Sequence, residues 1–221
     1  LVRGCSCRGT AGFVHVSCLA EQAKILMDEA FENHLDDKVK TERWGRWHTC
    51  GLCEQRYHGV VACALGWACW KTYVGRRERD WVRGMAMSVL GNGLNAARQY
   101  EDALTVKEAE LSTLRRFGAP EVHMLAVQNN LAISYEQLGK HEQTLRMRQD
   151  VYFGRLKLLG EEHVETIRAA NNCAFSLTDL KRFEEAKALM RKTIPVARRV
   201  HGENDENTLH LRKIYARILY K

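Results

Sequence analysis

The segment Asn129–Tyr135 reads NNLAISY, and the segment Asn171–Leu177, which starts 42 residues later, reads NNCAFSL. The same spacing separates three glycines: Gly118, Gly160 and Gly202. Each period contains two runs of apolar residues at helical spacing, with a polar turn between them. A single pair of short helices cannot bury its own apolar face, so neighbouring pairs must stack on one another. The sequence therefore predicts a mainly α fold in which residues 83–221 form a right-handed α-solenoid of helical hairpins.

The period also sets the expected organisation of the chain. Repeats are predicted at about residues 87–128, 129–170 and 171–212, with a partial last unit from Asn207 to Lys221. Residues 58–82 are predicted to be a helical connector. Seven of the eight cysteines fall in the first third of the chain, so residues 1–57 are predicted to form a small module of their own.

Composition and charge exclude several classes of protein. Apolar residues make up 45% and charged residues 28% of the chain, as in a globular protein. Residues 1–82 carry 12 basic and 10 acidic residues, and residues 83–221 carry 22 and 17, so the positive charge is dispersed and nucleic-acid binding is not expected. The longest apolar run, Gly59–Trp70, is shorter than the about 20 residues of a membrane span.

The N-terminal residues show no signal-peptide pattern, so we expect a cytoplasmic location. The sequence starts at Leu1 and not at Met, and it ends at Lys221 without a polar capping helix. We therefore expect the chain to be part of a longer protein.

Two close cysteine pairs predict a metal site in the N-terminal module. Cys5-x-Cys7 and Cys50-x-x-Cys53 each present two thiols from a short turn, and His15-x-x-Cys18 lies between them. A disulfide framework suits a secreted domain, which nothing in the sequence indicates. Thiolate-rich ligation selects zinc, and two distant pairs can complete its tetrahedral shell. The other cysteines, Cys63, Cys69 and Cys173, are expected to be core residues.

The complete spacing, with Gly12–Leu19 around the histidine and Tyr57 after the last pair, resembles the last six ligands of a RING-variant (RING-CH) zinc finger. The resemblance implies a cross-brace, with one complete zinc site formed by four cysteines: Cys5, Cys7, Cys50 and Cys53. It implies that His15 and Cys18 form half of a second site, so two zinc ions are expected in the full-length parent. The sequence departs from the family in a helical insert over residues 19–40 and in Gln22, which replaces a tryptophan.

The repeats resemble the tetratricopeptide repeats of kinesin light chains, which share the Asn-Asn-Leu-Ala start and the 42-residue unit. The resemblance implies a groove that binds protein or peptide ligands. Candidate groove residues are Asn129, Asn171, Arg168, Gln137 and Asp179. The asparagines have an alternative role in hydrogen bonds between helices. We expect that role for Asn130 and Asn172, and both roles remain open for Asn129 and Asn171.

The sequence contains no legible catalytic site. It has no phosphate-binding glycine loop and no Ser-His-Asp or Cys-His arrangement. We therefore predict a zinc-binding interaction scaffold or adaptor with structural Zn²⁺ and a peptide groove. The alternative is an E3 ubiquitin ligase, in which the finger recruits a ubiquitin-conjugating enzyme and the repeats select the substrate.

Overall fold

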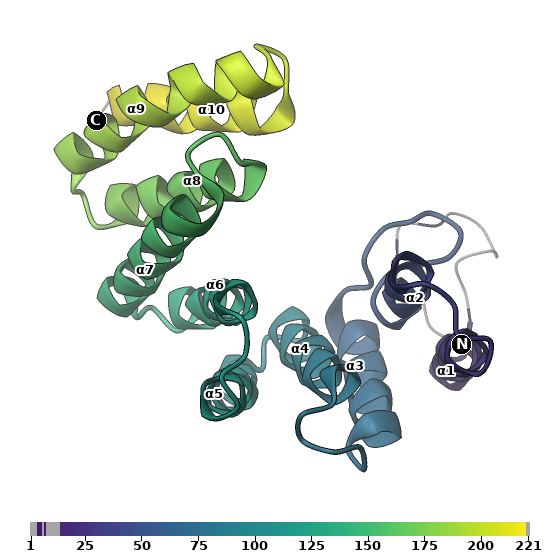
Figure 1. Ribbon diagram of the computed structural model, residues 1–221. Helices are drawn as coiled ribbons and strands as arrows, with labels where there is room; N and C mark the ends of the chain where they lie inside the picture. Colours follow the sequence, from purple (N-terminus) through teal and green to yellow (C-terminus); the bar gives the residue numbers. More distant parts are fainter. Residues whose placement is uncertain (1–3, 6, 8–13, 220–221) are drawn as a thin grey trace. The chain divides into compact units, whose positions relative to one another are not determined.

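The computed structural model describes residues 4, 5, 7 and 14–219, and it is mainly α-helical, as the sequence predicts (Figure 1). The helices are α1 (Val16–Glu32), α2 (Asp37–Trp44), α3 (Gly59–Tyr73), α4 (Trp81–Ala96), α5 (Tyr100–Arg116), α6 (Glu121–Gln137), α7 (His141–Leu159), α8 (Val164–Asp179), α9 (Phe183–His201) and α10 (Glu206–Leu219). A 3-10 turn, Gly45–Trp47, follows α2. Thr49 and Arg56 form an isolated antiparallel β-bridge.

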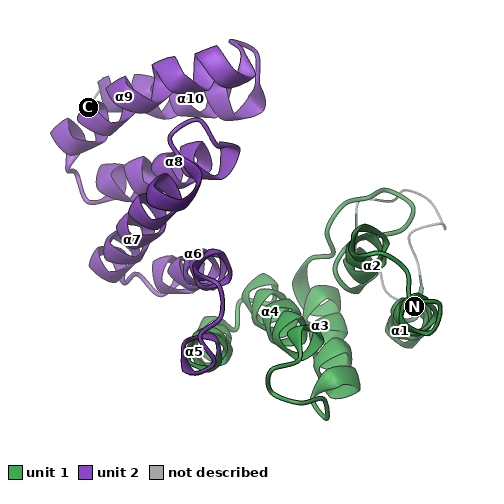
Figure 2. Ribbon diagram, in the orientation of Figure 1, with its two compact units in different colours: residues 1–113 green, residues 114–221 purple. Residues whose placement is uncertain are grey.

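The chain divides into two compact units, residues 1–113 and residues 114–221 (Figure 2). The first unit contains α1 to α4 and most of α5, and the second contains α6 to α10. Among the described residues, no helix combines the length and the apolar character that a membrane crossing needs.

The insert predicted as one helix over residues 19–40 is instead two helices, so that prediction was wrong. α1 ends at Glu32 and is capped by Asn33, whose side-chain amide donates a hydrogen bond to the Glu29 carbonyl of the last turn, and His34 takes a positive φ of 49°. Asp36 then starts α2, because its carboxylate accepts a hydrogen bond from the Val39 N–H at 2.9 Å. The side chains of Asn33 and Asp36 thus form hydrogen bonds with backbone groups at the two helix ends, in place of the backbone hydrogen bonds that a continuous helix would have made.

The two helices α1 and α2 fold over an aromatic core. Trp44 and Trp47 are each 1% exposed, and both contact the Tyr73 ring, at centroid distances of 5.4 and 5.9 Å. Ala23 and Met27 from α1 are fully buried in the same cluster. The apolar spacing of α1 thus serves to cover the aromatic residues of α2 and α3.

Helices α3 and α4 pack closely because each has a glycine at the contact. A Cβ on Gly66 would lie 3.0 Å from Leu90 Cα, and a Cβ on Gly93 would lie 2.5 Å from the carbonyl oxygen of Ala62. Side chains at these positions would separate the helices. The segment predicted as a connector therefore contains a helix that packs along α4.

A buried charged pair lies between α4 and α5. Lys107 is 1% exposed and Glu110 is 5% exposed, and both come from α5. The Ser88 hydroxyl of α4 donates a 2.5 Å hydrogen bond to Glu110 Oε1, and Gly91 leaves room for the stem of Lys107. Burial raises the pKa of Glu110 to about 7 and lowers the pKa of Lys107 to about 8.

The Glu110 carboxyl predicts a pH dependence of stability. Its folded pKa exceeds the unfolded value, so the folded state binds more protons in the interval between them, and its contribution is lost as the pH rises through that interval. From pH 5 to pH 7 the wild type should lose about 2 kcal/mol of stability that Glu110→Gln does not lose. The difference in the free energy of unfolding, variant minus wild type, should therefore increase by that amount. Urea titrations at the two pH values measure it, and an unchanged difference would contradict the assignment.

The second unit consists of the hairpins α6–α7 and α8–α9, followed by α10. Its largest core cluster joins apolar residues of α8, α9 and α10, with Met190, Ala197 and Leu211 fully buried. One turn position recurs along the chain with positive φ: Arg98 at 63°, Gly139 at 71° and Lys181 at 60°. It joins the two helices of each hairpin, so the repeated sequence corresponds to a repeated backbone conformation.

Candidate functional site

The structure brings four cysteine thiols together in the N-terminal module. One ligand atom from each of Cys5, Cys7, Cys50 and Cys53 lies within 4.8 Å of all the others. Cys5 and Cys50 are each 6% exposed, and the other two are half-buried. These are the four cysteines that the resemblance assigns to one complete metal site.

A tight turn positions the second cysteine pair. The Cys50 N–H donates to the Gln55 carbonyl at 2.9 Å, and the Glu54 N–H donates back to the Cys50 carbonyl at 3.0 Å. Glu54 takes a φ of 57°, and the bridge between Thr49 and Arg56 closes the turn. The loop is therefore held by its own backbone, and both sulfurs point into one cluster.

Gly4 places the first pair beside α3. The His58 N–H, at the start of α3, donates to the Gly4 carbonyl at 2.9 Å. A Cβ on Gly4 would lie 2.5 Å from the Val61 Cβ, so only glycine lets the backbone at this position approach α3 so closely. Tyr57, Val61 and Leu65 then cover the sulfurs of the cluster with apolar surface.

The four thiols compete for ionisation. Burial raises the pKa of Cys50, but the backbone N–H groups of Cys53 and Leu52 outweigh it, and the pKa falls to about 6. The pKa of Cys7 rises to about 12, first through its contact with the Cys53 thiol and then through Cys5. Thiolates this close repel one another, so all four ionise together only around a cation.

The geometry fits zinc. The Sγ atoms of Cys7 and Cys50 are 3.7 Å apart, too far for a disulfide. A tetrahedral Zn–S bond of about 2.3 Å implies about 3.8 Å between sulfurs. The four cysteines could therefore hold a zinc ion without rearrangement of this pair.

The other predicted ligands lie outside the four-thiol group. Cys18 Sγ is 4.0 Å from His15 Nδ1, and Cys18 is exposed, so these two residues are neighbours with no further ligand among the described residues. Cys69 and Cys173 are buried in the apolar clusters of their units, and Cys63 contacts Gln99. Of the flanking segment, Gly12 and Phe13 lie outside the described residues.

A second candidate site is a pocket of about 310 Å³ between α8 and α10. Arg168, Asn171 and Asn172 line it from α8, and Glu206 and His210 line it from α10. Amide, carboxylate and imidazole groups at one opening can bind the polar backbone of an extended peptide. The pocket thus contains two of the five predicted groove residues, Arg168 and Asn171.

The hydrogen bond between asparagines of successive repeats occurs once and is not repeated in the next unit. Asn172 Nδ2 donates to Asn129 Oδ1 at 3.2 Å, which links α8 to α6. The next position in the period, 42 residues after Asn172, is Ile214 on α10, which offers no such donor. The buried Oδ1 of Asn171 consequently has no hydrogen-bond partner in the described part of the chain. Asn129 thus serves the contact between helices, whereas Asn171 borders the pocket.

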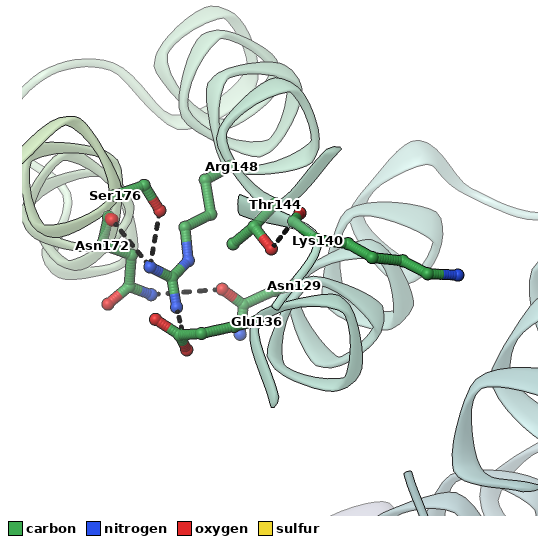
Figure 3. A network of polar contacts seen from close by, with 7 residues as sticks. All are labelled: Asn129, Glu136, Lys140, Thr144, Arg148, Asn172 and Ser176. Carbon is green, nitrogen blue, oxygen red and sulfur yellow. Dashed lines mark hydrogen bonds and ion pairs between the residues drawn. The ribbon is translucent and has the colours of Figure 1, made fainter. Parts of the chain in front are cut away.

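Arg148 is the centre of a buried polar network (Figure 3). From α7 it donates to Ser176 Oγ at 2.7 Å and to the Asn172 carbonyl at 3.2 Å, both on α8. It also forms a 2.7 Å ion pair with Glu136 of α6. One side chain therefore ties three helices together and fixes the face that carries Asn129.

The remaining predicted groove residues do not join the pocket. Gln137 is the last residue of α6 and is exposed. Asp179 is the last residue of α8 and is 3.8 Å from Arg217. Both lie about two turns beyond the asparagines. Sequence reasoning missed Glu206 and His210, although their positions directly before and within the partial last unit predicted from Asn207 are a signal that could have pointed to them.

Comparisons with known proteins agree with this repeat architecture. A family model described as tetratricopeptide repeat matches residues 166–207, which include most of α8 and all of α9. Among solved structures, the chain resembles a kinesin light chain-type protein of Podospora anserina with nearly identical TPR-like repeats. The TM-score is 0.60 and the identity 16%, over 94% of this chain and 88% of that one. It also resembles BtubC (BKLC) from P. vanneervenii, with a TM-score of 0.62 and 15% identity, over 92% of this chain and 84% of that one. No curated protein sequence matches the chain. These likenesses confirm the predicted TPR-like fold.

Proposed function

We propose that this protein is a zinc-binding interaction scaffold or adaptor, in which residues 1–57 form a metal-stabilised module and residues 83–221 form repeats that bind peptides. The convergence of four cysteine thiols within 4.8 Å supports the metal part of the proposal. A zinc ion there would stabilise the module, and the residues of the chain provide its ligands, the closed turn and the apolar cover.

The pocket between α8 and α10 supports the binding part of the proposal. An extended peptide exposes backbone N–H and C=O groups that its own structure does not satisfy, and asparagine amides can pair with both. Asn171 and Asn172 lie on one wall, with His210 opposite. The proposed ligand is therefore an extended segment of a partner protein.

Zinc content tests the metal site directly. Purified protein should contain about one zinc per chain, because one four-cysteine site is complete. Cys50→Ser should lose the metal, whereas Cys63→Ser, which changes a thiol outside the group, should keep it. Elemental analysis gives the ratio, and circular dichroism checks the helices. Wild-type protein that is folded and free of zinc after expression in zinc-supplemented medium would refute the metal site.

Peptide selection tests the groove. Peptides selected from a displayed random library against the whole protein should bind Asn171→Ala about fivefold more weakly, because a hydrogen bond to the backbone is worth about 1 kcal/mol. Gln143→Ala, an exposed change at the start of α7, serves as the control and should bind normally. Titration calorimetry measures both variants. Equal binding by wild type and Asn171→Ala would exclude this pocket.

The separation of the four-thiol group from His15 and Cys18 matches the pairing expected for a cross-brace, and it favours a second candidate, an E3 ubiquitin ligase. Gln22, in place of the family's tryptophan, is exposed on α1 and offers a conjugating enzyme no large apolar contact. Discharge of ubiquitin from a panel of charged conjugating enzymes, present in wild type and absent in Cys50→Ser, would support the ligase. If the zinc-loaded protein discharges ubiquitin from none of these enzymes, the ligase is excluded and the scaffold function remains.

A further inference from the structure

Helix α3 presents an apolar seam to solvent. Val60 is 76% exposed, Trp67 is 44% exposed and Val74, directly after the helix, is 38% exposed. Ala64 and Lys71 are exposed between them. The spacings along this face are four, three, four and three residues, which is the pattern of positions a and d in a coiled coil. The seam therefore extends ~21 Å along α3 at 1.5 Å per residue.

The opposite face of α3 is already occupied. Val61, Leu65 and Cys69 are almost fully buried against neighbouring helices and the cysteine cluster. Trp67 is not among the residues of the aromatic cluster that contains Trp44 and Tyr73. The seam is thus an additional apolar surface, separate from the pocket between α8 and α10.

The charge around the seam is positive. α3 contains Lys71 and no acidic residue, and Lys71 forms no ion pair with any described residue. The turn that follows, residues 75–80, adds three arginines and two acidic residues. Arg76 forms an ion pair with Asp80, and Arg77 is exposed. A partner that lies along the seam would meet a lysine inside it and a basic turn at its end.

We propose that this seam docks an acidic amphipathic helix of a partner protein. The heptad spacing suits a helix as the binding element, since apolar residues of the partner can pack between Val60, Trp67 and Val74. Glutamates beside the partner's apolar stripe would pair with Lys71 and Arg77. The seam thus gives the scaffold a second binding surface, of a different kind from the groove for extended peptides.

A second copy of the chain fits the seam less well. The three large apolar residues expose roughly 300 Å² together, the size of a functional patch on a monomer. A stable dimer buries about 800 Å² per partner. In a symmetric pair, moreover, the seams contain no acid to face Lys71. A partner with acidic residues beside its apolar stripe removes this mismatch.

Two synthetic peptides test the proposal with the full chain. Each has about three heptads, enough for a stable helix, with leucine and alanine at the a and d positions. One has glutamate at the flanking e and g positions, and the other has lysine. Fluorescence titration at low salt should show at least about tenfold tighter binding of the glutamate peptide. Val60→Glu and Trp67→Glu should each weaken it about tenfold or more, whereas Thr72→Glu, exposed on α3 outside the seam, should weaken it by less than about threefold.

Val60 is the decisive position, because its exposure makes an effect on folding small, and circular dichroism checks each variant. Equal binding of the two peptides, or binding that survives Val60→Glu, would overturn the proposal. Self-association in sedimentation that Val60→Glu abolishes, without peptide binding, would assign the seam to a second copy. Binding only to vesicles that contain phosphatidylserine would assign it to a lipid surface.

Discussion

Gly93→Ala should destabilise the first unit by about 2–3 kcal/mol, although alanine is the better helix former. The new methyl group would lie 2.5 Å from the carbonyl oxygen of Ala62 and 3.1 Å from the Cα of Cys63. Both obstacles are backbone atoms of α3, so no side chain can rotate away to make room. The helices would have to separate, and the contacts around Gly66 would be lost with them.

Gly84→Ala provides the matched control on the same helix. A Cβ at Gly84 meets no atom within 4 Å, so this change should stabilise the unit by up to about 1 kcal/mol. Urea unfolding followed by tryptophan fluorescence measures both variants, since all five tryptophans lie in residues 1–113. Similar effects of the two substitutions would show that α3 and α4 do not pack as closely as described.

Arg148→Met should cost the second unit about 2–4 kcal/mol. The side chain of Arg148 is 8% exposed and that of Glu136 is 19% exposed, so loss of the arginine leaves a poorly solvated carboxylate. Ser176 also loses its partner. The shape of the site tolerates methionine, because Met190 occupies the position one period later and is fully buried. The loss therefore reflects unpaired polar groups and not a cavity.

Two variants separate these causes. Arg148→Met combined with Glu136→Gln should recover about half of the loss, because the stranded charge is gone. Lys187→Met breaks a surface ion pair with Glu184, whose side chain is 82% exposed, and should cost less than about 0.5 kcal/mol. Chemical unfolding followed by circular dichroism gives all values. A double variant no more stable than Arg148→Met would place the cost in packing.

The repeats could be predicted because the pattern that forms each hairpin lies within a short stretch of sequence. Apolar spacing and the recurrence at Asn129 and Asn171 are enough for the hairpins, and the comparisons confirm the TPR-like fold. Which four cysteines lie together was implied by the resemblance to a RING-variant finger, because the spacing alone left three close ligand pairs. The metal itself stays a prediction.

The features missed from the sequence depend on contacts between distant residues. Nothing near Gly93 indicates that its partner is the backbone of Ala62, 31 residues earlier. Arg148 resembles any solvated arginine until Glu136 and Ser176 are placed around it. The break between α1 and α2 is a different case. Asp36 is a residue type that often caps the start of a helix, so the sequence did indicate the break, but the apolar spacing over residues 19–40 favoured one continuous helix.

The recurring left-handed turn makes the hairpins unequal in how readily they open. Gly139 takes its φ of 71° without cost, whereas Arg98 and Lys181 hold positive φ with a Cβ, at about 1 kcal/mol each. This energy is released when the turn opens, so the α4–α5 and α8–α9 turns should exchange their amide protons with solvent before the α6–α7 turn does. Local opening of each unit would then begin at its turn that holds a positive φ on a residue with a Cβ: Arg98 in the first unit and Lys181 in the second.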